Sequence, residues 1–130
     1  MSADLARRAV ACPRWRWMAG MLAIDTTAQA GRVRWLRPTE GVRLDTGAMP
    51  LFRVTRAADD APSWPVWVPD FSDPATIGCL LALVREAWGA PLESPCWDEH
   101  ESGWYFTAQE RWSYAATEAE ALVKALEAAP

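Results

Sequence analysis

Apolar residues between positions 73 and 89 recur at the spacing of an amphipathic α-helix. Asp73 is a residue type that caps helix N-termini, Pro74 suits the first helical position, and Gly89 suits a left-handed C-terminal cap. The pattern therefore predicts a helix over residues 73–88 with one buried face. The apolar stripe of this helix consists of Ile77, Leu80, Leu81, Val84 and Trp88.

A second helix is predicted over residues 117–128, where Thr117 and Glu120 have the spacing of a capping box. Its inward face holds Ala119, Leu122, Val123 and Leu126. Residues 2–11, with Ser2 as a cap, predict a short helical turn that Pro13 stops.

Alternation of polar and apolar residues predicts strands over residues 21–25, 32–36, 41–44 and 51–56, and a fragment at 64–68 whose flanking prolines suit a strand edge. Residues 102–109 and 111–115 predict a hairpin. Its facing aromatic residues are predicted to be Trp104 and Phe106 on one strand and Trp112 and Tyr114 on the other.

These elements predict a single α+β domain over residues 1–130. The expected architecture is an antiparallel sheet of about five strands, with the helices at 73–88 and 117–128 packed on one face. A chain of 130 residues buries about two thirds of the surface that it exposes when unfolded, which is enough for a substantial core.

Nine tryptophans are spread along the whole chain, so they mark no single local motif. An indole has a large apolar face and one N–H donor, which suits either a dense core or a contact surface. The nine are Trp15, Trp17, Trp35, Trp64, Trp67, Trp88, Trp97, Trp104 and Trp112.

One local cluster alternates guanidinium and indole groups over residues 14–17. In an extended segment Arg14 and Arg16 would lie on one side and Trp15 and Trp17 on the other. One interpretation is structural, with the indoles in the core and the arginines in water. The other is a binding site, in which arginine holds an anion and indoles stack on a base or a partner's side chain. Further candidates for an exposed aromatic contact are Trp64 and Trp67.

Charge is distributed unevenly along the chain. Residues 1–56 hold ten arginines and four acidic residues, net +6, whereas residues 57–130 hold three basic and thirteen acidic residues, net −10. The two halves could neutralise each other across a shared surface. Alternatively, a basic face could bind phosphate or nucleic acid, or an acidic face could meet a basic partner.

The sequence predicts no enzyme, no catalytic residues and no cofactor. It has one histidine, scattered glycines that form no phosphate-binding loop, and adjacent carboxylates where turns and helix caps need them. Cys96 and His100 have a metal-like spacing but supply only half of a zinc site, so we predict an acidic turn and no metal. The odd number of cysteines and the lack of a signal peptide or a long apolar run predict a cytoplasmic protein that spans no membrane.

Three segments carry a resemblance to small uncharacterised proteins encoded by phages and prophages of GC-rich bacteria. They are residues 12–18 with Gly20 and Met21, residues 69–89 and residues 122–129, together about a third of the chain. Ala19 stands where that pattern has proline. The resemblance implies an accessory protein that acts in the cytoplasm of a bacterial host, and it implies no catalytic residues.

Two hypotheses of different class follow. The first is a non-enzymatic protein that binds a host protein complex, for example an inhibitor of host defence of the anti-CRISPR kind. An exposed hydrophobic patch with acidic surroundings would support this hypothesis. The second is a nucleotide or nucleic-acid binding module that uses Arg14, Arg16 and nearby indoles. A virion assembly or structural accessory protein is a third alternative. Small binding proteins of this size are often homodimers.

Overall fold

The computed structural model describes residues 3–25, 30–37, 41–45, 50–54 and 67–130. Within these residues the chain combines helices with antiparallel strands, which confirms the α+β class. The helices are α1 (Ala3–Ala11), α2 (Pro74–Trp88) and α3 (Glu118–Ala128). None of these three is long and apolar enough to cross a lipid bilayer.

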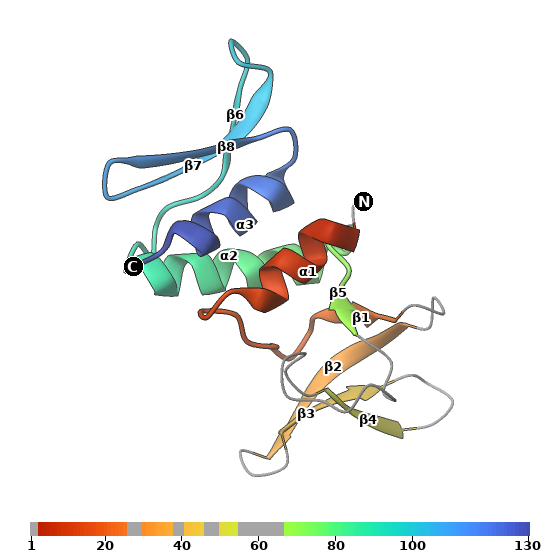
Figure 1. Ribbon diagram of the computed structural model, residues 1–130. Helices are drawn as coiled ribbons and strands as arrows, with labels where there is room; N and C mark the ends of the chain where they lie inside the picture. Colours follow the sequence, from red (N-terminus) through yellow and green to blue (C-terminus); the bar gives the residue numbers. More distant parts are fainter. Residues whose placement is uncertain (1–2, 26–29, 38–40, 46–49, 55–66) are drawn as a thin grey trace.

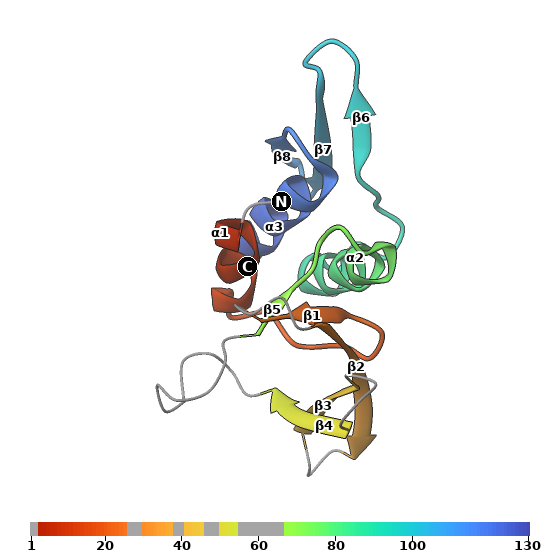
Figure 2. The same ribbon diagram turned by 90° about the vertical axis from the view of Figure 1, so that its right-hand side faces the viewer.

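The described strands form two antiparallel sheets. The first has the order β4-β3-β2-β1-β5, and its strands are β1 (Leu22–Ile24), β2 (Ala30–Arg37), β3 (Gly41–Asp45), β4 (Pro50–Val54) and β5 (Val68–Pro69). The second has the order β6-β7-β8, and its strands are β6 (Cys96–Asp98), β7 (Gly103–Ala108) and β8 (Arg111–Ala115). The helices lie in a layer between the two sheets (Figure 1), and the view at right angles shows the same order (Figure 2).

The predicted arrangement, one sheet with two helices on one of its faces, is therefore wrong. Strand β7 pairs with β8 on one side and, on the other, with β6, a strand that the sequence pattern did not predict. Only two residues separate β8 from α3, so this helix folds back onto the adjacent hairpin, whose buried residues Phe106 and Ala108 join the core of the helices. Periodicity identifies strands, but it does not say which strands pair.

Most of the predicted elements are confirmed. Helix α2 has Asp73 as its N-cap and Gly89, at φ 60°, as its left-handed C-cap, and the Thr117 side chain caps α3 by accepting from the Glu120 N–H. The predicted N-terminal turn is a helix of nine residues, whereas its predicted cap, Ser2, lies outside the described residues. Of the predicted strand at 64–68, residues 64–66 also lie outside them, and Val68 begins β5.

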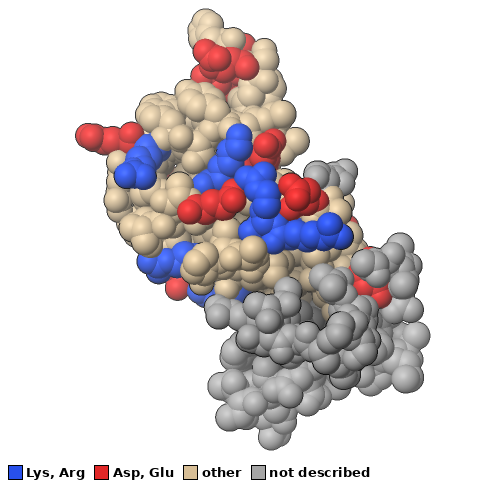
Figure 3. All heavy atoms as spheres, in the orientation of Figure 1, with Lys and Arg blue, Asp and Glu red and all other residues tan. Residues whose placement is uncertain are grey.

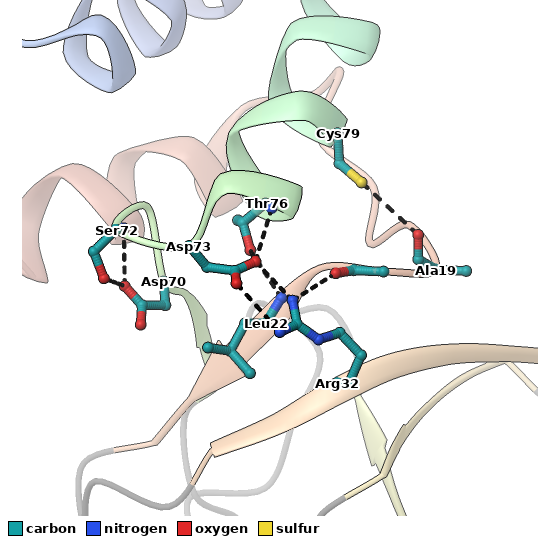
Figure 4. Close-up of polar contacts among 9 residues, drawn as sticks. Ala19, Leu22, Arg32, Asp70, Ser72, Asp73, Thr76 and Cys79 are labelled. Atoms are coloured by element: carbon teal, nitrogen blue, oxygen red, sulfur yellow. Dashed lines mark hydrogen bonds and ion pairs between the residues drawn. The ribbon is translucent and has the colours of Figure 1, made fainter.

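A network of hydrogen bonds around Asp73 fastens the start of α2 to the first sheet (Figure 4). The Asp73 carboxylate accepts from the Thr76 N–H at 3.0 Å and the Thr76 hydroxyl at 2.9 Å. It also accepts two bonds from the Arg32 guanidinium of β2, at 2.6 and 3.2 Å. The Leu22 N–H of β1 donates to the Thr76 oxygen at 2.8 Å, and Thr76 is fully buried. The Asp73 carboxylate thus caps the helix and binds the Arg32 side chain of β2, while Thr76 joins the same helix turn to the main chain of β1.

The hydrophobic core joins the three helices. The Trp88 indole N–H, near the end of α2, donates to the Ala125 carbonyl of α3 at 2.8 Å in a buried bond. Each fully buried leucine or valine contributes roughly 1.5–3 kcal/mol relative to exposure. The buried aliphatic side chains of α2 and α3 are Leu80, Leu83, Val84, Leu122, Val123 and Leu126.

The Asp73 network predicts an acid-sensitive contribution to stability. The hydrogen-bonded Arg32 guanidinium lowers the pKa of Asp73 below its usual value. A carboxyl with a depressed folded pKa stabilises the protein above its unfolded pKa of about 4, and this contribution is lost as the pH falls through the folded pKa.

We therefore expect Asp73→Ala to lower the free energy of unfolding at pH 7 by about 2 kcal/mol, through loss of a cap and a charge-assisted pair. Asp73→Asn should cost less, because its amide oxygen still caps the helix. Urea unfolding at several pH values from 7 to 3 measures the free energy of unfolding of both proteins. The difference in this free energy between wild type and Asp73→Asn should narrow below about pH 4. A gap that stays constant over this range would show that the Asp73 charge does not stabilise the fold.

Candidate functional site

The indoles of the Arg-Trp cluster belong to the core. Trp15 is 2% exposed and Trp17 is 7% exposed. Their ring centroids lie 5.5 Å apart at an interplanar angle of 83°, and Trp15 also meets Phe71 edge-on at 6.4 Å. These faces are covered by the protein itself, so the structural interpretation of the cluster accounts for both indoles.

The two arginines of the cluster are exposed and already have partners. Arg16 pairs with the Glu86 carboxylate of α2 at 2.7 Å, and Arg14 donates to the main-chain oxygen of Pro130. Both arginines and Trp15 line a small pocket of about 240 Å³ with Leu83, Glu86 and Ala87. Glu86 places a negative charge in this pocket, which opposes the binding of an anion there.

The remaining predicted contact residues are placed as follows. Trp67 is 8% exposed and belongs to the core, whereas Trp64 lies outside the described residues. The structure thus brings Trp15, Trp17 and Trp67 into the core, and leaves Arg14 and Arg16 on the surface.

The aromatic residues of the second sheet are divided between its two faces. The register pairs Tyr105 with Tyr114 and Thr107 with Trp112, so these four residues share one face. Phe106 is almost fully buried on the other face, beneath α3. The prediction that Trp104 and Phe106 face Trp112 and Tyr114 is therefore wrong, because the two pairs lie on opposite faces.

The turn between β7 and β8 sets this register. Gln109 and Glu110 both have positive φ angles, 49° and 64°, as in a two-residue hairpin turn of type I′. The Gln109 side-chain amide donates to the Trp88 carbonyl at 3.1 Å and so anchors the turn to the end of α2. Such a turn normally contains asparagine or glycine, so the sequence did not reveal it.

The exposed face of the second sheet carries three aromatic rings in mutual contact, which we call the aromatic face. Its members are Tyr105, Trp112 and Tyr114. The centroid of Tyr105 lies 5.1 Å from that of Trp112 and 5.8 Å from that of Tyr114, and the Trp112 and Tyr114 rings are nearly parallel at 12°. Trp112 is 57% exposed and Tyr114 is 42% exposed. Large rings left this accessible on a sheet are typical of a contact surface.

A second aromatic pair lies at β6, on the face of the second sheet opposite the aromatic face. Trp97 and Trp104 pair across β6 and β7 with centroids 5.9 Å apart, and Trp97 is half exposed. On the aromatic face, a side-chain hydrogen bond with Cys96 raises the pKa of Tyr105, so its hydroxyl stays neutral. The ring cluster itself therefore carries no charge.

Acidic side chains lie near one end of the second sheet. Asp98, Glu99 and Glu101 lie at the tip of the β6–β7 hairpin. Figure 3 shows acidic side chains at the top of the molecule, with mostly uncharged side chains directly below them. The Asp98 carboxylate accepts from the main-chain N–H groups of His100 and Glu101, at 2.9 and 3.3 Å, as in a turn. Within the described ranges no three potential ligand side chains are grouped to hold a metal ion.

A hollow of about 480 Å³ opens beside Tyr114, where small residues follow the sheet. Its lining consists of Glu101, Ser102, Gly103, Tyr114, Ala115 and Ala116. It therefore combines one aromatic ring with one exposed carboxylate. The sequence prediction missed this site because it set Trp112 and Tyr114 opposite Trp104 and Phe106. The available signal was the run of consecutive aromatic residues over positions 104–106, since a strand with aromatic residues at successive positions places rings on both faces of a sheet.

No protein-family model, curated protein or solved structure matches this chain.

Truncation of a core indole and of an aromatic-face indole should affect stability differently. Trp15→Ala should lower the free energy of unfolding by about 3–5 kcal/mol, because it leaves a large cavity. Trp112→Ala should lower it by about 1 kcal/mol or less, because only ring contacts at the surface are lost. Urea unfolding measures both, and equal losses would place Trp112 in the core and remove the aromatic face as a candidate site.

Proposed function

We propose that this protein is a non-enzymatic binding protein that docks a partner protein through the aromatic face of its second sheet. The proposal rests mainly on one observation. Trp112 and Tyr114 are exposed, and their rings are in contact with each other on the surface of a folded sheet. Aromatic residues at the centre of an interface, with polar residues at its rim, supply most of the binding energy in protein complexes.

The setting of this proposal comes from the resemblance of residues 12–18, 69–89 and 122–129 to phage and prophage proteins. In that setting the partner is a host protein complex in the bacterial cytoplasm, and the proposed role is to occlude a complex of host defence. The acidic surroundings of the aromatic face agree with the kind of surface that such an inhibitor needs.

The alternative of nucleic-acid binding has less support. Its proposed stacking residues, Trp15 and Trp17, are buried, and Arg16 is paired with Glu86. Bases could stack on Trp112 and Tyr114, but the carboxylates around these rings would repel the phosphate backbone. We therefore favour a protein partner.

A photo-crosslinking experiment tests the proposal in cells. A benzophenone-bearing phenylalanine analogue replaces Trp112 or, as a control, Leu92, an apolar side chain that is 90% exposed outside the aromatic face. We expect a discrete protein adduct from position 112, no such adduct from position 92, and loss of the adduct when Tyr114→Ala is added. The captured protein should then bind the purified wild-type chain and not Tyr114→Ala.

Adducts that are the same from both positions, or that persist with Tyr114→Ala, would contradict docking at the aromatic face. Adducts to nucleic acid from position 112 would favour the alternative function.

A further inference from the structure

We propose that the aromatic face recognises an arginine-bearing, extended segment of its partner, and that one guanidinium group enters the hollow between Tyr114 and Glu101. The inference rests on the proposed function, because it names the chemistry of the segment that docks. It is drawn from the hollow, the rings and the charge around them.

The hollow has the size and the lining for a long cationic side chain. Its volume of about 480 Å³ lies in the range of ordinary ligand pockets, roughly 300–1,000 Å³. Gly103, Ala115 and Ala116 present little side-chain bulk, so the space beside the Tyr114 ring stays open. The one charged group in its lining is the Glu101 carboxylate, which can accept two parallel hydrogen bonds from a guanidinium.

The rings favour guanidinium over other groups. A planar guanidinium is weakly hydrated and stacks on aromatic faces, with tryptophan the strongest partner. Trp112 and Tyr114 are nearly parallel and more than two fifths exposed, so each offers part of a ring face to such stacking. One arginine can thus stack on Tyr114 while its charge pairs with Glu101.

The net negative charge of the region around the aromatic face favours a basic partner. Residues 89–117 hold five acidic residues and one arginine, a net charge of −4. That arginine, Arg111, pairs with Ala108 and so belongs to the face opposite Tyr105. Lys124 of α3 donates to the main-chain oxygen of Tyr114 at 2.9 Å and lies 3.7 Å from Glu120. The charge of Lys124 is therefore paired within the protein. Two copies of the acidic region 89–117 would repel each other.

The acidic groups are spaced for an extended segment. Asp98, Glu99 and Glu101 precede β7 at one end, and Glu110 follows it at the other. Six residues of β-strand span about 20 Å. A partner segment of about six residues would cross the aromatic face and place basic side chains near carboxylates at both ends.

A peptide titration tests this inference on the purified full chain. The probe is a capped peptide with three arginines alternating with glycines, and its matched control carries citrulline, which keeps the shape of arginine and removes the charge. Tryptophan fluorescence and amide NMR shifts report binding. We expect saturable binding of the arginine peptide, shifts confined to β6–β8 and the hairpin tip, and at least tenfold weaker binding of the citrulline peptide.

Two charge variants locate the guanidinium. Glu101→Gln removes the carboxylate of the hollow, whereas Glu99→Gln makes the same charge change at a residue outside its lining. We expect Glu101→Gln to weaken binding about tenfold and Glu99→Gln to weaken it less than threefold. Trp112→Ala should weaken binding of the arginine peptide about tenfold, whereas Leu92→Ala should leave this binding unchanged.

Equal binding of the two peptides, equal effects of the two glutamine variants, or no binding at millimolar peptide would overturn the inference. Stronger binding of a thymidine oligonucleotide than of the arginine peptide would show that the aromatic face binds nucleic acid instead. Concentration-dependent self-association through the same residues would show that it binds a second copy of this chain. If the photo-crosslink at position 112 survives while the peptide fails, the docking function stands and only the arginine chemistry is wrong.

Discussion

The Asp73 carboxylate holds the structure together at the point where the helix layer meets the first sheet. It caps α2 and accepts two bonds from Arg32 on β2, while Thr76 links the same helix turn to β1. At its other end α2 is bonded through Trp88 to α3 and through Gln109 to the turn of the second sheet. This helix therefore fixes both sheets relative to each other, and with them the orientation of the aromatic face.

The tryptophans are divided by this layered arrangement. Trp15, Trp17, Trp67 and Trp88 fill the core around the helices. The second sheet receives α3 on one face only, so the rings that alternate onto the other face remain exposed. A small domain with two sheets and a single helix layer has no further element among its described residues to cover that face. Exposure of the aromatic face is thus a consequence of topology.

The sequence predicted local structure well and spatial relations poorly. The caps Asp73, Gly89 and Thr117 have direct chemical signatures, so α2 and α3 were located nearly to the residue. The split into two sheets depends on pairing partners, which periodicity does not encode. The site was misplaced for the same reason: alternation put Trp15 and Trp17 on one side of a segment, but only the fold decides that this side is the core. The type I′ turn at Gln109 and Glu110 lacks the usual residues, so the faces of the hairpin were assigned wrongly.

The central claim is that the aromatic face is open to solvent in the free protein, ready for a partner. The most direct measurement is the relaxation of each indole signal in NMR spectra upon addition of a soluble paramagnetic agent. We expect strong broadening of the ring signal of Trp112, comparable to that of Trp97, which is half exposed on the opposite face, and little change for Trp15, Trp17 and Trp88. Protection of Trp112 equal to that of Trp88 would show that the face is covered and would contradict the account.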